Sequence, residues 1–254
     1  MTLFRNAVFT AALSGLLAGI ILAALQTYAT VPLILQAETF ENAGAPAHDH
    51  GPAPAEAAPA DTMAAPAEAV PHEHDEEAWA PADGFERFAY SAAVNAVSGI
   101  GFALLLVAIS EFAGGIVNWR QGVLWGLAGF AVFTLAPGLG LPPELPAMPA
   151  ADLGARQTWW VATVLATGIG LSLIAFRGTV VLSLVGLALI VAPHIVGAPQ
   201  PVSHESPIPE ALHHQFVVAV TVTNLIFWVA LGGIVALVRP RFAGSADGLR
   251  NSFA

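Results

Sequence analysis

The chain has 254 residues, of which 56% are hydrophobic and 10% are charged, and its formal net charge is −10. It contains no Cys, which excludes disulfides and thiolate metal sites, and no Lys, which excludes a Walker A phosphate loop and a Schiff-base lysine. The acidic balance argues against a nucleic-acid partner, which would require a basic face.

Six apolar segments follow one another along the chain and predict membrane-spanning helices. They reach or approach the ~20 residues that cross a ~30 Å hydrocarbon core. The first is longer than the apolar region of a signal peptide, so we expect it to be an uncleaved span. The third and fifth are short and end at "LAPG" and "VAPH". The segments cover approximately residues 6–30, 88–112, 122–136, 158–176, 179–196 and 212–238.

Residues 41–85, between the first two spans, are rich in Pro, Ala and acidic residues and poor in large apolar ones. Such a composition cannot bury a core, so we expect a disordered loop. The chain then divides into a first transmembrane arm (1–40), a periplasmic His- and acid-rich loop (41–85) and a five-helix remainder (86–254).

Arginine placement predicts the orientation of the bundle. If the chain starts inside, only Arg87 and Arg156 fall outside, as the positive-inside rule favours. Both termini are then cytoplasmic, and of the 18 acidic residues only Glu111 and Asp247 lie inside. The inner basic residues are Arg5, Arg120, Arg177, Arg239, Arg241 and Arg250.

A weak internal repeat suggests how the spans pair. The end of the third span, "FTLAPGLGLPPELP", resembles that of the fifth, "LIVAPHIVGAPQPV", and the next spans open with "RQTWWVATV" and "HHQFVVAVT". We interpret this as three consecutive helical hairpins of the same orientation, since many transporters are built from repeats. The alternative is that Pro and small residues near helix ends look alike in any membrane protein. The predicted fold is an all-α polytopic bundle of about six transmembrane helices.

All eight His residues fall in outer loops or at outer span ends in this topology. Neutral imidazole is a common ligand for Co²⁺, Ni²⁺, Zn²⁺ and Cu²⁺. A flexible His- and acid-rich loop would capture divalent cations with little selectivity, and the acidic outer surface would concentrate them. The alternative is a solvated acidic linker with incidental His. The loop candidates are His48, Asp49, His50, His72, Glu73, His74 and Asp75.

The bundle itself should carry the selective step. His194 follows Pro193, which removes a backbone donor and is expected to disrupt the helix and free carbonyls beside the imidazole. His213 and His214 open the sixth span, and one of them could converge with His194. Because adjacent helical residues point ~100° apart, at most one of the pair faces the bundle well. The alternative for His194 is an ordinary hydrogen bond to a neighbouring helix.

Carboxylates and neutral polar groups could line a path for a cation from the outer loop through the bundle. Glu38 and Glu41, spaced i, i+3, would share a face if their segment is helical and could pass a cation onward; a solvated helix end is the alternative. Glu111 lies near the inner face of the bundle, where ionisable groups are functional suspects. Polar residues inside the spans either pack helices together or line a path: Asn95, Ser98, Thr163, Thr167, Thr221, Thr223 and Asn224.

Several blocks, in order, resemble the CbtA family of predicted bacterial cobalt transporter subunits: "FRNAVFTAALSGLLAGIILAALQTYATVPLILQAETFE", "GFERFAY", "WGLAGFAVFTLAPGLGLPPELP", "RQTWW" and "PHIVGAP". The resemblance implies cobalt uptake linked to cobalamin synthesis and a small single-span partner, CbtB, with a His motif outside the membrane. The matching motifs also imply six candidate residues for cation transfer: Glu38, Glu41, Glu144, Arg156, Gln157 and His194.

We therefore expect a multi-pass subunit of the bacterial inner membrane that captures Co²⁺ outside and passes it inward, without enzymatic activity. The inside-negative potential could drive a divalent ion at ~2.3 kcal/mol per charge per 100 mV. The alternatives are a nickel or zinc permease and a membrane-anchored metal-binding or sensing module that does not transport. A b-type cytochrome is disfavoured because its axial His ligands would have to lie within facing helices.

Overall fold

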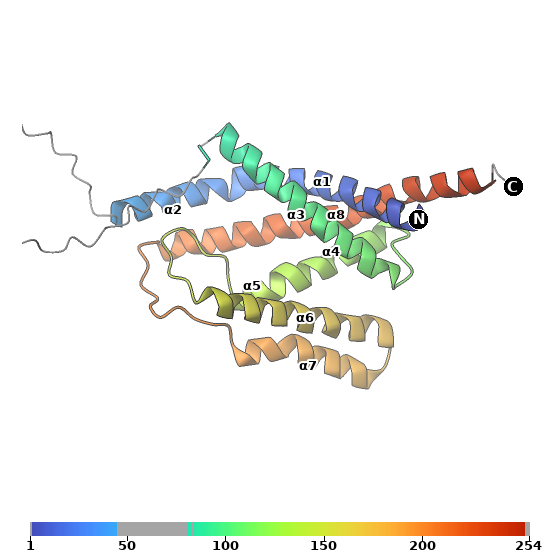
Figure 1. The fold of residues 1–254 in the computed structure, drawn as a ribbon. Helices are drawn as coiled ribbons and strands as arrows, with labels where there is room; N and C mark the ends of the chain where they lie inside the picture. The colour runs from blue at the N-terminus through green and yellow to red at the C-terminus, as the bar shows by residue number, and fades with distance from the viewer. Residues whose placement is uncertain (1, 45–80, 83, 252–254) are drawn as a thin grey trace, which may run out of the picture.

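The computed structural model describes residues 2–44, 81–82 and 84–251, with side chains for 4–41, 81–82 and 84–242 (Figure 1). The described part of the chain is helical with no strand, so the predicted all-α fold is confirmed. The elements are α1 (Thr2–Ala29), α2 (Val31–Gly44), α3 (Phe85–Glu111), α4 (Trp119–Phe130), the π-helix η1 (Ala131–Leu135), α5 (Ala136–Gly140), α6 (Leu153–Arg177), α7 (Val180–Val196) and α8 (Glu210–Asn251).

Five of the helical segments in the described ranges are long and apolar enough to cross a membrane, and α7 is a shorter apolar helix of 17 residues. The five are Phe4–Ala29, Phe85–Glu111, Trp119–Gly140, Leu153–Arg177 and Glu210–Phe242. The protein is therefore a multi-pass membrane bundle. Each of these six helical segments overlaps one of the six predicted spans, and α2 is an additional helix between the first two.

The third span is longer than predicted. Pro137 suggested an end near residue 136, but α4, η1 and α5 form a continuous 22-residue segment to Gly140. The backbone N–H of Ala136 bonds to the carbonyl of Ala131, five residues back. This widened turn lies directly before Pro137, which has no N–H to contribute to a regular helix.

Close helix pairs form where glycines meet. Gly15 and Gly19 of α1 lie against Gly99 and Asn95 of α3, and Gly170 of α6 faces Gly186 of α7. On α4, Gly122 and Gly126 pack on Gly232 and Trp228 of α8. Small residues allow membrane helices to approach closely without a side chain between the backbones.

These contacts correct the expected order of the hairpins. The first hairpin, α1 with α3, is present as predicted. The other close pairs are α1 with α8, α4 with α8 and α6 with α7, rather than spans three with four and five with six. In Figure 1, α8 runs between the α1–α3 pair and the α4–α7 layer.

Two hydrophobic clusters hold α8 in place. The larger one joins α1, α3, α4 and α8 around Phe130, Phe227, Trp228, Leu231 and Val235. The smaller one lies toward the α2 end of the bundle and joins α2, α8 and their neighbouring loops. We call this second cluster the apolar plug; its buried residues are Ala37, Leu145, Ile208, Leu212 and Phe216.

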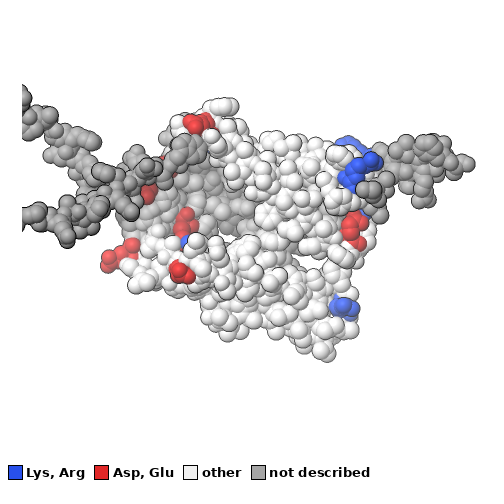
Figure 2. Space-filling view, viewed as in Figure 1, with Lys and Arg blue, Asp and Glu red and all other residues white. Residues whose placement is uncertain are grey.

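Charged residues separate to the two ends of the molecule. Figure 2 shows acidic side chains over the end where α2 lies and most arginines at the end where the chain termini lie. We call these the α2 end and the terminal end. The apolar surface between them carries no charged side chain in this view, as expected for a lipid-facing belt.

Candidate functional site

A cavity of about 140 Å³ lies at the α2 end, between two loops and the start of α8. We call it the vestibule. Its polar lining comes from three separate parts of the chain: Glu144, then Gln200, His204 and Ser206, and finally His213. Imidazole and carboxylate groups together suit a borderline divalent cation.

His213 is held in the vestibule wall. Its Nε2 atom lies 3.1 Å from the carbonyl oxygen of Pro143, and the side chain is half-buried. His214, one residue along α8, is exposed. The structure therefore agrees with the expectation that only one of this pair faces the bundle.

Glu144 is paired with an arginine. Its Oε2 atom lies 3.0 Å from Nη2 of Arg156, at the start of α6. Asp152 caps that helix by accepting a hydrogen bond from the backbone N–H of Ala155 at 2.8 Å, which positions Arg156 in the first turn. A cation that binds Glu144 must compete with this guanidinium.

Glu38 shows the same arrangement. It lies on α2, which is helical as the i, i+3 argument required, and its Oε1 atom is 3.1 Å from Nη1 of Arg87 on α3. Glu41 is exposed on α2, and Gln157 is exposed on α6. The Glu38–Arg87 pair was not foreseen, because nothing in the local sequence of either residue indicates its partner.

His194 lies beside the vestibule but does not line it. Its ring packs edge-on against Trp159 of α6, with ring centroids 6.0 Å apart, and the Trp159 indole is also in contact distance of Gly140 in the vestibule wall. Trp159 therefore contacts both His194 and the wall of the vestibule.

The expected helix break at Pro193 is not present. α7 continues through it to Val196. The carbonyl of Pro193 accepts hydrogen bonds from the backbone N–H of Gly197 at 3.0 Å and from the Trp159 indole N–H at 3.3 Å. Because Pro193 lies in the last turn, its missing N–H removes only one bond near the helix end.

The predicted ligands do not form a preassembled metal site in the described part of the chain. Among those residues, no group of three or more His, Asp or Glu side chains is arranged to hold a metal ion. His194 and His213 lie against different neighbours rather than converging. The loop candidates His48, Asp49, His50, His72, Glu73, His74 and Asp75 lie outside the described residues.

His204 is a vestibule imidazole that was not among the predicted ligands. It is exposed, in the Pro-rich loop between α7 and α8. Its position could have been predicted from the prolines on both sides, in "PQPV" and "ESPIP". Prolines restrict the backbone of a loop and so keep its polar residues close to the helix ends.

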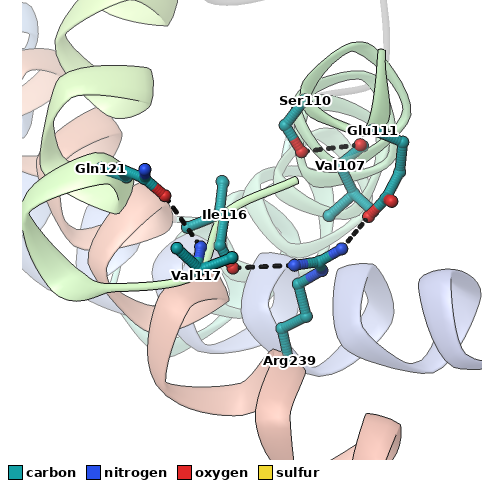
Figure 3. Close-up of polar contacts among 7 residues, drawn as sticks. All are labelled: Val107, Ser110, Glu111, Ile116, Val117, Gln121 and Arg239. Atoms are coloured by element: carbon teal, nitrogen blue, oxygen red, sulfur yellow. Dashed lines mark hydrogen bonds and ion pairs between the residues drawn. The ribbon is translucent and has the colours of Figure 1, made fainter. Parts of the chain in front are cut away.

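The terminal end is held by Arg239 of α8 (Figure 3). Its Nη2 atom pairs with Oε1 of Glu111 at 2.6 Å, and its Nη1 donates to the carbonyl of Ile116 at 2.9 Å. Gly115 lies directly beneath the guanidinium with φ of +77°, where a side chain would be strained and would collide with Arg239. We call these four residues the arginine clamp.

A model of the CbtA family, described as "Probable cobalt transporter subunit (CbtA)", matches residues 4–239. The chain belongs to the CbtA family. The match runs from the first turn of α1 to Arg239, so it includes the vestibule, both clusters and the arginine clamp. No curated protein and no solved structure matches the chain.

Membership makes the protein a subunit of a cobalt transporter family, with a metal ion as the cargo and a partner implied by the word subunit. The resemblance inferred from the sequence blocks is thereby confirmed.

Proposed function

We propose that this protein captures Co²⁺ on the outer side of the bacterial inner membrane and passes it inward through the bundle. The observation that carries the proposal is the vestibule, where Glu144, His204 and His213 line one cavity although they come from distant parts of the sequence. The α2 end is then periplasmic, and both termini are cytoplasmic.

Capture and entry are separate steps in this proposal. The loop residues His48, Asp49, His50, His72, Glu73, His74 and Asp75 collect cations without selecting among them, and the carboxylates Glu38 and Glu41 pass them on. In the vestibule, an arriving cation replaces Arg156 at Glu144 and binds the imidazoles of His204 and His213 with its remaining positions. His194 acts at the next layer, behind Trp159.

Partial ligation suits this role. A site with a complete ligand set would hold the ion instead of releasing it, whereas conduction requires binding that is strong enough to admit the ion and weak enough to release it. A single-span, His-bearing subunit of the CbtB type would supply further imidazole from outside the membrane. The imported ion would serve cobalamin synthesis, and the chain itself carries out no chemical reaction.

The test is accumulation of radiolabelled Co²⁺ by cells that make the chain with and without its single-span partner. Competition by Ni²⁺ and Zn²⁺ separates a cobalt carrier from a general one, and binding without accumulation would indicate a sensing module. Reporter fusions after Ala254 and within residues 51–70 should report opposite sides of the membrane; the same side for both would exclude this topology.

A further inference from the structure

A second cavity, of about 190 Å³, lies farther along α8, between the α1–α2 junction, α3 and α8. We call it the polar cavity. Its volume accommodates several water molecules, each of which takes about 30 Å³ in the liquid. Its lining includes Gln26, Thr30, Ser91, Thr223 and Asn224, all polar and none ionisable. Polar groups at membrane depth are costly unless they are paired or face a hydrated interior.

Three residues of the polar cavity have lining oxygens that can still accept hydrogen bonds or bind a cation: Thr30, Thr223 and Asn224. The Thr30 hydroxyl donates to the carbonyl of Gln26 at 3.2 Å, and the Thr223 hydroxyl donates to that of Ala219 at 2.9 Å. The Asn224 amide N–H donates to the carbonyl of Val220 at 2.9 Å. Because these hydrogens are used within the helices, the two hydroxyl oxygens and the amide oxygen remain as acceptors. The Gln26 oxygen already accepts from the Asn95 amide at 2.6 Å, so the Gln26 side chain offers its N–H groups, which suit bound water. The lining can therefore hold a hydrated cation through the three free oxygens.

The two cavities lie in line along one face of α8. His213 lines the vestibule, and Phe216, Val220, Thr223 and Asn224 line the polar cavity. Spacings of three and four residues put these positions on the same face of a helix. From His213 to Val220 the rise is about 10 Å, at 1.5 Å per residue.

The apolar plug lies between the two cavities. Phe216 belongs both to the plug and to the wall of the polar cavity, and Leu212 lies one turn nearer the α2 end. For an ion to pass between the two cavities, these packed side chains would have to separate, because apolar constrictions stop ions by excluding water and open when they rehydrate.

The Glu38–Arg87 ion pair lies one helical turn from the polar cavity, where α2 and α3 face each other. Ile34 and Ser91 line the cavity, while Glu38 is four residues after Ile34 and Arg87 is four residues before Ser91. The Glu38–Arg87 ion pair therefore lies at the mouth between α2 and α3, and its separation would expose a carboxylate there.

We infer that the polar cavity is an intermediate binding site for a divalent cation. The cation keeps part of its water shell there and is held by hydroxyl and amide oxygens. The inference rests on the proposed transport function and adds a second, imidazole-free step to it. An ion that leaves the nitrogen ligands of the vestibule binds more weakly here, which favours onward movement.

A cysteine introduced into this Cys-free chain reports directly on cation entry. With Co²⁺, purified Thr223→Cys should develop a near-ultraviolet sulfur-to-cobalt charge-transfer band. Val222→Cys is the matched control, since Val222 is the adjacent residue and is 47% exposed on the lipid-facing side. Equal absorbance from the two variants would overturn the inference.

The second arm tests whether the native oxygen is used. Thr223→Val preserves the side-chain shape but removes the hydroxyl, and should lower Co²⁺ uptake about tenfold, as expected for one contact to a charged group. Thr223→Ser keeps the oxygen and should restore uptake. Unchanged uptake in Thr223→Val, at equal membrane levels, would also overturn the inference.

The two proposals fail in different ways. If the unsubstituted protein accumulates Co²⁺ but Thr223→Val does so equally well, the transport function stands and the polar cavity is not on the path. If Thr223→Cys develops the cobalt band while the unsubstituted protein accumulates no Co²⁺, the cavity is a cation site and the transport function is wrong.

Discussion

The two ends of the bundle use the same kind of ion pair in different surroundings. At the α2 end, Glu144 and Glu38 each pair with one arginine beside a cavity. At the terminal end, Arg239 binds a carboxylate and a backbone carbonyl together, and its guanidinium occupies the space over Gly115.

This difference indicates what each pair does. We infer that Arg156, which pairs with Glu144 in the vestibule wall, can give up this partner to a metal ion, whereas Arg239 joins α3, the following turn and α8 and so fixes three elements at once. In the proposed transport function, cations would enter at the α2 end, and the arginine clamp would close the other end. Movement of an ion to the cytoplasm would require the clamp to open.

The largest expected effect is that of His194→Ala, which should abolish Co²⁺ uptake at any outside concentration. The bundle has no Cys and few carboxylates, so little can replace this imidazole behind Trp159. Uptake is measured over a concentration series at matched protein levels. Ile195→Ala, next along α7 and 79% exposed, is the control. Rescue of the His194 variant by excess cobalt would show that this residue serves capture instead of transfer.

Breaking the pairs at the two ends should affect stability unequally. Arg239→Leu removes two contacts of a charged group and should lower the free energy of unfolding by about 1.5–3 kcal/mol. Arg156→Leu removes a single ion pair and no contact to a backbone carbonyl, so it should lower the free energy of unfolding by less than about 1 kcal/mol. Denaturant unfolding in detergent, followed by Trp fluorescence, measures both. Equal losses would contradict the distinction between a clamp and an exchangeable pair.

Within the vestibule, His213 and His214 provide a matched comparison. His213→Ala removes a lining imidazole and should raise the Co²⁺ concentration for half-maximal uptake by at least about tenfold, the lower range for weakened metal sites. His214→Ala, which removes an exposed ring, should change it little. If both variants behave alike, entry does not pass through the vestibule.

The smallest effect is expected from the outer loop. Replacing His48, His50, His72 and His74 together should raise the required Co²⁺ concentration by at most about tenfold, because the loop only increases the local concentration of cations. Maximal uptake should be unchanged. A complete loss of uptake in this variant would place the transfer step in the loop.

The sequence predicted the spans best where apolar runs are continuous. The second span was expected over 88–112 and α3 covers Phe85–Glu111. The third was predicted too short, because Pro137 normally ends a helix and the widened turn of η1 that accommodates it has no local signature.

Helix pairing and ion pairing could not be predicted in the same way. The order of the spans along the chain favoured packing between consecutive helices. Instead, the glycines of α4 pack against α8, which lies far along the chain. Glu38, Glu144 and His213 were singled out by residue type, but their partners depend on packing between distant segments. The polar residues Thr223 and Asn224 were noted without a role, because a helical pattern does not distinguish packing from a cavity wall.

The most direct test is radiolabelled Co²⁺ accumulation in proteoliposomes of the purified protein, with an imposed inside-negative potential and with or without the single-span partner. The account predicts accumulation that grows with the potential, is lost in His194→Ala and falls about tenfold in Thr223→Val. Binding to the vesicles without accumulation inside them, or accumulation that neither substitution reduces, would contradict it.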